Sequence, residues 1–392
     1  MESLPMNYKN ILQKHKFIVF CIDHYNMLGI CRSLGEKGIT PIVIFVGERS
    51  RLIKHCRYVK QFYKVKTREE GLNVLLNKFG NESDIPFLYT GDDNTTQFLD
   101  NHYDELEGRF YFFNCGVKGG ITQYMDKAAI CKIAALNGIS PAKSELLKRN
   151  EIPQTLKYPI ITKVTMSTKG AWKEDVHICN NEQELREAWN QIEADEILAQ
   201  EYIIKKNELC VDGYSINGGE QVVFVGSSEY IRFTEKRYGN YMWIKPLQDK
   251  ATREKICNII KATRFSGIFE FESLIGPDDE LYFLEVNFRN STWSYAYSRV
   301  GLNIPYEWAV HTLFNSTNAY ESLPQSFTPI TAIVEIDDFR DSVIGKKITI
   351  WKWLKDLISS DCKYYWNIKD PLPALRVLIP YFIACLLPVK KK

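Results

Sequence analysis

The chain has 392 residues, enough for two or three packed domains. Apolar residues make up 45% of it and charged residues 25%, which is typical of a soluble globular protein and excludes disordered, collagen-like and disulfide-stapled chains. The 50 Lys and Arg residues nearly balance the 48 Asp and Glu residues, so the formal net charge is only +2. We therefore expect no nucleic-acid partner, because no global basic field would recruit one.

The first part of the chain alternates short apolar runs with a helical stretch. The run Phe17–Ile22, a helical stretch ending near Gly35 and Gly38, and the run Pro41–Val46 have the spacing of a βαβ unit, which implies a parallel sheet. A second round of strand, helix, strand and helix is expected at 59–65, 68–79, 87–90 and 94–106. The first strand leads into Asp-His-Tyr-Asn at 23–26 instead of a GxGxxG turn, which argues against a dehydrogenase.

The middle and last parts have a different pattern. Gly119 and Gly120 precede a predicted helix over 122–137, and this composition suits a hinge before a new domain. The later segments indicate an α+β arrangement of strands and hairpins with two helices, at 181–193 and 250–264. The predicted fold class is thus α/β plus α+β, with a doubly wound parallel-sheet domain at the N-terminus. We expect three parts: an N-terminal α/β domain over 1–118, a second domain over 119–325 and a C-terminal extension over 326–392.

Ten cysteines are spread singly along the chain, without a CxxC pair or a nearby histidine at metal-ligand spacing. Most have apolar neighbours, so we expect buried free thiols in a reducing cytoplasm. The segment before Phe17 lacks the apolar core of a signal peptide. The sequence therefore predicts a cytoplasmic location.

Two neighbouring predicted strands carry the most informative polar side chains. The period of two in a strand places Glu270 and Glu272 on one face of the first strand, and Glu285 and Asn287 on one face of the second. Arg289 points the same way. Oxygen ligands gathered beside a phosphate are what Mg²⁺ requires. The alternative is that these residues form the solvated face of an ordinary hairpin.

The sequence G-x-F-E-F followed by E-V-N-x-R resembles the metal-binding hairpin of the ATP-grasp superfamily, and the order of motifs extends the resemblance over about residues 15–315. The resemblance implies an ATP-grasp fold of two α+β subdomains after the N-terminal domain. It also implies ATP and Mg²⁺ (or Mn²⁺) as cofactors, with the metal held by Glu270, Glu285 and Asn287.

The same resemblance implies the residues that contact the phosphates of ATP. Lys127 and Lys163 occupy the positions of the two phosphate-contacting lysines, and Lys163 is also implied to be catalytic. The phosphate-covering loop corresponds to the segment with Ser167 and Gly170, which is poorer in glycine than the loop of the family. Taken alone, without the resemblance, each lysine would be interpreted as an ordinary surface lysine.

A further segment resembles the part of the family that holds the nucleoside. Main-chain groups of Glu201, Tyr202 and Ile203 would contact adenine, and the Glu208 carboxylate would accept from the ribose hydroxyls. The alternative for Glu208 is an acidic residue in a solvated loop.

Enzymes of this superfamily mostly activate a carboxylate as an acyl phosphate, which an amine then attacks. The resemblance implies Arg289 as the catalytic stabiliser of the transferred phosphoryl group and of the tetrahedral intermediate. Candidate substrate contacts lie in the loops after the first and fourth strands and in a basic, aromatic segment: Asp23, Asn26, Asp92, Asp93, Arg232 and Arg237. Helix N-caps or solvated loops are the alternatives.

Three weaker motifs resemble one particular group within the superfamily. T-G-D-D at 90–93, G-L-N-I-P at 301–305 and K-D-P-L-P at 369–373 are similar to the D-aspartate ligase and carboxylate–amine ligase group, which serves cell-wall peptides and surface polysaccharides. Small-molecule carboxylate and amine substrates, and a lipid-linked precursor, are the partners implied. Ligation onto a sugar carboxylate, another acyl or carboxy phosphate chemistry, and a nucleotide-binding regulatory or scaffold protein remain alternatives.

The tail from Val377 to Val389 has thirteen apolar residues and precedes Lys390–Lys392. A membrane-spanning helix needs about 20 residues, and Pro380 interrupts this segment, so spanning is excluded. Packing on the protein is one alternative. The other, which we predict, is peripheral contact with the inner membrane surface, with the lysines on anionic headgroups.

Overall fold

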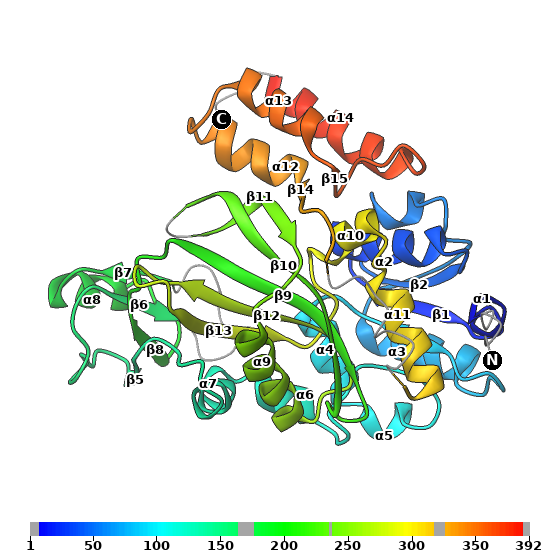
Figure 1. Cartoon of the computed structure of the whole chain (residues 1–392), viewed down its shortest axis with the longest axis horizontal. Coiled ribbons are helices and arrows are strands. Elements are labelled where there is room, and N and C mark those ends of the chain that lie inside the picture. Colours follow the sequence, from blue (N-terminus) through cyan, green and yellow to red (C-terminus); the bar gives the residue numbers. More distant parts are fainter. Residues whose placement is uncertain (1–7, 164–175, 235–236, 317–325, 387–392) are drawn as a thin grey trace.

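The computed structural model describes residues 8–163, 176–234, 237–316 and 326–386. These residues form three β-sheets, of four, seven and four strands, with helices around them (Figure 1). Helix α1 (Tyr8–Leu12) precedes the first sheet.

The N-terminal sheet is parallel, with the strand order β3-β2-β1-β4. Its strands are β1 (Phe17–Cys21), β2 (Pro41–Val46), β3 (Gln61–Val65) and β4 (Phe87–Tyr89). Alternate residues of β1 enter two different cores, one shared with helix α2 and the other with helix α3, so helices cover both faces. The connecting elements are α2 (Tyr25–Glu36), η1 (Ile53–His55) and α3 (Arg68–Phe79). The predicted doubly wound arrangement is confirmed.

The chain adds β2 and β3 on one side of β1 and then crosses to add β4 on the other side, so the point at which the order of strands switches lies between β1 and β4. In such sheets the loops at the carboxyl ends of the strands on either side of the reversal form a natural binding crevice. Four of the predicted substrate contacts lie just after β1 and β4, in the loops or in the first turns of the helices that follow, and the sheet brings them to this one edge.

Two predicted helices are each divided in the structure. The stretch 94–106 forms α4 (Asp93–Asp100) and α5 (Tyr103–Leu106), and the stretch 122–137 forms α6 (Gly120–Met125) and α7 (Lys127–Leu136). Asp126 breaks the second stretch, because its backbone is extended and its side chain caps α7 by accepting from the Ala129 N–H. The break places Lys127 at the first position of a new helix.

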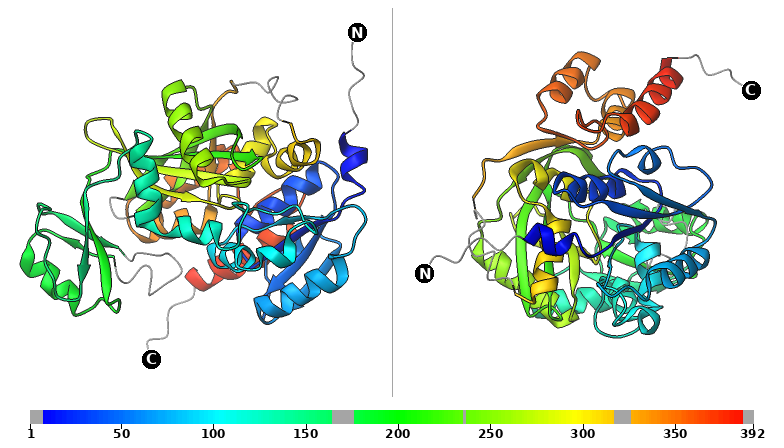
Figure 2. Two further views of the ribbon diagram at one scale, coloured as in Figure 1. Left: turned by 90° about the horizontal axis from the view of Figure 1, so that it is seen from below. Right: turned by 90° about the vertical axis from the view of Figure 1, so that its right-hand side faces the viewer.

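A small sheet with a core of its own follows, in the strand order β5-β8-β6-β7. Its elements are β5 (Ser144–Lys148), β6 (Ile160–Lys163), β7 (Ile178–Cys179), α8 (Glu182–Trp189) and β8 (Glu196–Glu201). Figure 2 shows this part projecting from the rest of the molecule.

The largest sheet has the order β13-β12-β9-β10-β11-β14-β15 and is antiparallel except for the β14–β15 pair. Its strands are β9 (Asn207–Ile216), β10 (Gln221–Thr234), β11 (Arg237–Lys245), β12 (Gly267–Ile275), β13 (Leu281–Asn287), β14 (Ile330–Ile333) and β15 (Cys362–Lys363). Helices α9 (Lys250–Thr263), α10 (Ser294–Tyr297) and α11 (Ile304–Phe314) and the turn η2 (Ser298–Val300) accompany it. One continuous apolar core joins this sheet to the N-terminal sheet, with the Trp308 ring packed against Phe87, Tyr89 and Phe113.

The C-terminal part contains α12 (Glu335–Asp338), the π-helical turn η4 (Phe339–Ile344), α13 (Ile350–Ser359) and α14 (Leu372–Leu386), which lie at one end of the molecule (Figures 1 and 2). The guanidinium of Arg32, fully buried in α2, donates to Asp370 and to the carbonyls of Tyr364 and Tyr365, which anchors this part to the N-terminal sheet. Among the described helices, none is both long and apolar enough to cross a bilayer. The domain boundaries predicted at residues 118 and 325 stay a prediction. Strands β14 and β15, which lie after residue 325, are part of the large sheet.

Candidate active site

Four polar side chains meet on one face of the β12–β13 hairpin. The register pairs Glu270 with Asn287 and Glu272 with Glu285, so residues from both strands point to the same side. The Asn287 amide donates to Glu270 Oε2 at 3.1 Å and to Glu272 Oε1 at 2.6 Å. Glu270 is almost completely buried, unlike a residue on the solvated face of a hairpin. The structure therefore brings Glu270, Glu285 and Asn287 together.

A fifth acidic or amide side chain, Asp212, belongs to the same cluster and was not predicted from the sequence. It lies on β9, next to β12, directly opposite Glu270. Both of its carboxylate oxygens are buried, and neither has a hydrogen bond of good geometry within the described part of the chain. The alternation in ELCVDGYSI, which puts Glu208 and Asp212 on one face, was the available signal.

The buried carboxylates lack sufficient positive charge around them. Burial and the charge of Asp212 raise the pKa of Glu270, and burial and the charge of Glu270 raise the pKa of Glu272. Glu270 Oε1 is buried and has no hydrogen-bond partner among the residues that the structure describes. A divalent cation that prefers oxygen ligands fits this cluster, because it would supply the missing positive charge. In the described ranges no three His, Cys, Asp or Glu side chains form a metal site by themselves, so a cation would need further ligands from a bound substrate or water.

Two lysines face this cluster. Lys127 Nζ lies 3.3 Å from Glu285 Oε2, and Lys163 Nζ donates to Gln200 Oε1 at 2.7 Å. Burial and the neighbouring charge of Lys127 lower the pKa of Lys163 to about 8. These two lysines, far apart in sequence, are therefore close enough to interact. Ser167 and Gly170 lie outside the described residues.

Arg289 connects the hairpin to the N-terminal sheet. Its Nε donates to Asp93 Oδ1 at 2.5 Å and its Nη2 to Asn287 Oδ1 at 3.0 Å. Asn26 completes the junction, because its amide donates to the carbonyls of Gly91 and Asn290. The loops after β1 and β4 thus meet the end of β13 beside the carboxylate cluster.

Other residues predicted as substrate contacts have structural partners. The Asp23 carboxylate accepts from the Ser50 hydroxyl and from the backbone N–H groups of residues 51–53, and Asp92 caps α4. Arg232 forms ion pairs with Asp338 and Asp356, so the structure does not bring it to the cluster. The side chain of Arg237 is outside the described part of the chain.

The segment predicted to hold the nucleoside begins at Glu201, the last residue of β8. The Glu201 N–H donates to the Lys143 carbonyl and the Tyr202 N–H to the Pro159 carbonyl, which joins this segment to the small sheet. Glu208 is only 6% exposed and pairs with Lys205, so the alternative of a solvated loop is wrong for it. Its charge acts on both Lys163 and Glu272, which places it at the edge of the same cluster. Ile203 lies in the loop between β8 and β9.

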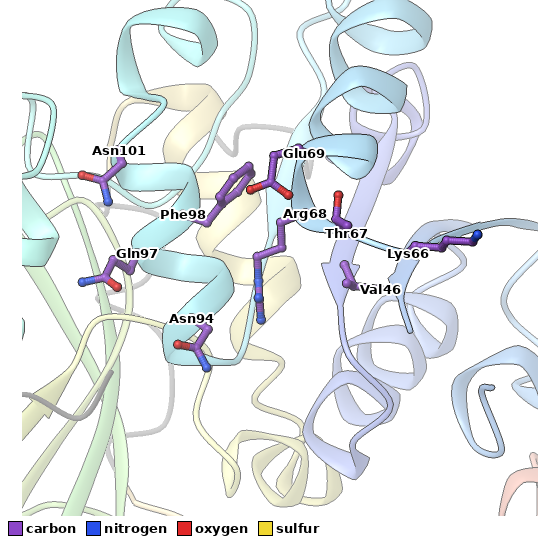
Figure 3. A pocket seen from close by; sticks show the side chains of 9 residues that line it. All are labelled: Val46, Lys66, Thr67, Arg68, Glu69, Asn94, Gln97, Phe98 and Asn101. Atoms are coloured by element: carbon purple, nitrogen blue, oxygen red, sulfur yellow. The ribbon is translucent and has the colours of Figure 1, made fainter. Parts of the chain in front are cut away.

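A cavity of about 490 Å³ lies between α3, α4 and the end of β2, near the contact between Arg289 and Asp93 (Figure 3). Arg68 lies at its centre in Figure 3 and donates to Thr95, on α4. Asn94 and Gln97 line the cavity from α4, and Asn94 is next in sequence to the Asp93 that binds Arg289. The cavity was not predicted, because its walls come from segments with no shared motif.

Several solved structures share this architecture. An L-amino acid ligase from Bacillus licheniformis matches with a TM-score of 0.62 and 14% identity over 81% of this chain and 79% of that one. N5-carboxyaminoimidazole synthetase from Staphylococcus aureus, complexed with ADP, matches with a TM-score of 0.63 and 20% identity over 85% of this chain and 87% of that one. A complex of biotin carboxylase from Campylobacter jejuni with β-γ-ATP matches with a TM-score of 0.60 and 16% identity over 80% and 74%.

No protein-family model and no curated protein sequence matches the chain. The structural matches nevertheless cover four fifths or more of the chain. The chain therefore has the ATP-grasp fold that its sequence motifs resemble.

Proposed function

We propose that the chain is an ATP-dependent, ADP-forming ligase that joins a carboxylate to an amine. The observation that carries this proposal is the meeting of Arg289, Lys127 and Lys163 with the carboxylates of the β12–β13 hairpin at one buried place. Such a place suits phosphoryl transfer, in which the protein mainly positions the reactants and neutralises charge. The ADP and ATP analogue named for two of the structural matches agree with it.

In the proposed reaction a carboxylate oxygen attacks the γ-phosphorus of ATP, and ADP leaves. The amine then attacks the acyl carbon, forms the new carbon–nitrogen bond and loses a proton, while inorganic phosphate departs with the carboxylate oxygen. Arg289 would stabilise the transferred phosphoryl group and the tetrahedral intermediate, held in place by Asp93. The carboxylate substrate would lie at the loops after β1 and β4, next to Asn26 and Asp93.

The same proposal assigns the nucleotide contacts. Lys127 and Lys163 would bind the phosphates, Glu201–Ile203 the adenine and Glu208 the ribose. Mg²⁺ or Mn²⁺, held by Glu270, Glu285 and Asn287, would neutralise phosphate charge.

The affinity for ATP is expected to fall as the pH rises through about 8. Lys163 has its pKa lowered to about 8, so below that pH it is an ammonium ion and above it a neutral amine that offers no charge to a phosphate. Calorimetric titration with ATP between about pH 7 and pH 9 measures this change. Lys163→Arg should remove the dependence, because a guanidinium stays charged in this range. An identical pH profile in the two proteins would remove Lys163 from phosphate binding.

The finer parts of the proposal concern the biological setting. We propose a cytoplasmic enzyme of cell-wall or surface-polysaccharide synthesis, whose acceptor is a lipid-linked precursor and whose C-terminal tail touches the inner face of the membrane. The motifs at 301–305 and 369–373 and the apolar tail support this setting.

An ADP-release assay tests the proposed reaction. A panel of amino acids and uronic acids is offered with and without an amine, and ADP formation is expected only when carboxylate and amine are both present. Glu285→Gln should abolish this release, and Glu280→Gln, in the exposed turn of the same hairpin, is the matched control. ATP binding without turnover for every pair in the panel would contradict the ligase and favour a nucleotide-binding scaffold.

A further inference from the structure

Exposed apolar side chains gather in the C-terminal part of the chain. Of the eighteen large apolar side chains that are exposed in the described residues, ten lie between 344 and 383, about a tenth of the sequence. They are Ile344, Ile350, Trp351, Ile358, Trp366, Ile368, Leu372, Leu375, Ile379 and Ile383. Single exposed apolar residues are normal on a protein surface, but a concentration of this kind marks a binding surface.

Helix α14 is apolar on two sides. Ala374, Val377, Leu378 and Tyr381 pack on the core of the protein. The other side is an exposed stripe of Leu372, Leu375, Ile379 and Ile383, at the spacing of one helix face. A helix that is apolar all round is normally covered on all sides, and the described part of the chain covers only one side of α14.

Helix α13 has the same property. Trp353 is buried and its ring lies 4.9 Å from Phe339 and 6.1 Å from Phe382 of α14, so the two helices adjoin. Trp351 and Ile358, seven positions apart on the opposite face, are 77% and 78% exposed. Trp side chains favour the interface between water and lipid, where one edge of the indole stays wet.

The exposed charges around these faces are mostly positive. The exposed basic residues between 344 and 386 are Lys346, Lys347, Lys352, Lys355, Lys369 and Arg376. Of the three acidic residues in this range, Asp356 and Asp370 are buried in ion pairs with arginines, and only Asp361 is exposed. The face therefore combines apolar side chains with a surplus of positive charge.

Apolar side chains combined with positive charge favour a lipid surface over a second protein chain as the binding partner. In a symmetric contact with a second copy, the lysines of one chain would meet those of the other, which is unfavourable. Protein interfaces are also depleted of lysine. An anionic lipid surface satisfies both features, because acyl chains accept the apolar side chains and headgroups attract the lysines.

We propose that α13 and α14 together form a lipid-binding face that docks the protein on anionic membranes, with Trp351 and Ile358 entering the headgroup region. The inference rests on the tail contact in the proposed function and extends it to a second helix. Arg32 with Asp370, and Arg232 with Asp338 and Asp356, fix this face rigidly to the α2 helix and the large sheet. Docking would thus hold the active site at a constant orientation to the membrane.

Flotation of the full chain with vesicles tests this face. Vesicles of phosphatidylcholine with phosphatidylglycerol are expected to carry the protein at low salt, and vesicles of phosphatidylcholine alone to carry much less of it. Ile358→Glu and Trp351→Glu should each lower the partition coefficient about tenfold. Leu136→Glu, at the end of α7 and equally 78% exposed, is the matched control and should float like the unchanged chain.

The outcomes separate this inference from the proposals on which it rests. If Ile358→Glu and Trp351→Glu float like the control while removal of residues 387–392 releases the protein, the tail contact stands and the α13 face is wrong. If the unchanged chain does not float, both are wrong. The ADP-release assay needs no membrane, so it tests the proposed ligase activity separately. Activity of the variants in this assay also shows that they are folded. A shift of these variants from dimer to monomer without any flotation would overturn the lipid face in favour of self-association.

Discussion

Replacement of Arg289 by lysine is expected to lower kcat for ligation by about 10²- to 10³-fold, with little change in the KM for ATP. The Arg289 side chain is only 15% exposed, and its guanidinium is held by two separate contacts, from Nε to Asp93 and from Nη2 to Asn287. A lysine keeps the charge but cannot hold both contacts in one plane while it faces a phosphoryl group. The loss should therefore appear in the chemical step. Steady-state kinetics with the best carboxylate and amine pair measure it.

A matched control for this substitution is Arg186→Lys, on α8, where the arginine is about half exposed and pairs with Glu182. That variant should keep its kcat, because an exposed ion pair contributes little. If Arg289→Lys and Arg186→Lys have the same kcat, Arg289 takes no part in the reaction.

Replacement of Glu270 by glutamine is expected to have opposite effects on stability and on activity. Without a bound metal the Glu270 carboxylate is buried next to Asp212 and one of its oxygens lacks a partner, so a neutral amide should raise the Tm of the ligand-free protein. Mg²⁺-dependent ADP formation should fall by about 10²-fold or more, because one of the proposed metal ligands would lose its charge.

The pH dependence of this effect has a defined sign. The pKa of Glu270 is raised in the folded protein, so its ionised form costs stability as the pH rises above the usual carboxyl value. The gain in Tm from Glu270→Gln should vanish below about pH 4, where the carboxyl is protonated in both states, and should grow as the pH rises to about 8, the raised pKa of Glu270. Differential scanning calorimetry at several pH values, with Glu280→Gln as the control, checks this. A lower Tm at neutral pH would show that the carboxylate is stabilised by contacts other than those described.

Much of the candidate site could be predicted from the sequence because it lies on two strands joined by a short turn. The period of two placed Glu270, Glu285 and Asn287 on one face, and the structure pairs their strands in the register that this requires. Asp212 was missed because its relation to Glu270 depends on which strands are neighbours in the sheet. That choice is set by packing over a long sequence separation, which local patterns do not record.

The two divided helices show a similar limit. Residues 122–137 are compatible with one continuous helix, and no Gly or Pro marks the break. The break at Asp126 depends on its side chain, which caps α7, and Asp in a helix pattern is also tolerated on a surface. Boundaries of this kind are decided by a balance of about 1 kcal/mol between capping and continuation.

The C-terminal face could be only half predicted. The thirteen apolar residues of the tail predicted an apolar segment from Val377, but in the structure α14 begins at Leu372 and α13 lies beside it. In the sequence IWKWLKDL, nothing local separates Trp351, which is exposed, from Trp353, which is buried. The difference arises because Phe339 and Phe382, which lie in other helical segments, pack against Trp353.

The central claim, that a substrate carboxylate is activated by phosphoryl transfer from ATP, is tested most directly by following an oxygen atom. A carboxylate substrate labelled with ¹⁸O is converted with ATP and amine, and the inorganic phosphate is analysed by mass spectrometry. The account predicts one ¹⁸O atom transferred to phosphate for each ADP released, because the carboxylate oxygen forms the new bond to phosphorus. Phosphate that carries oxygen only from water would show hydrolysis of ATP without acyl phosphate formation, and would contradict the account.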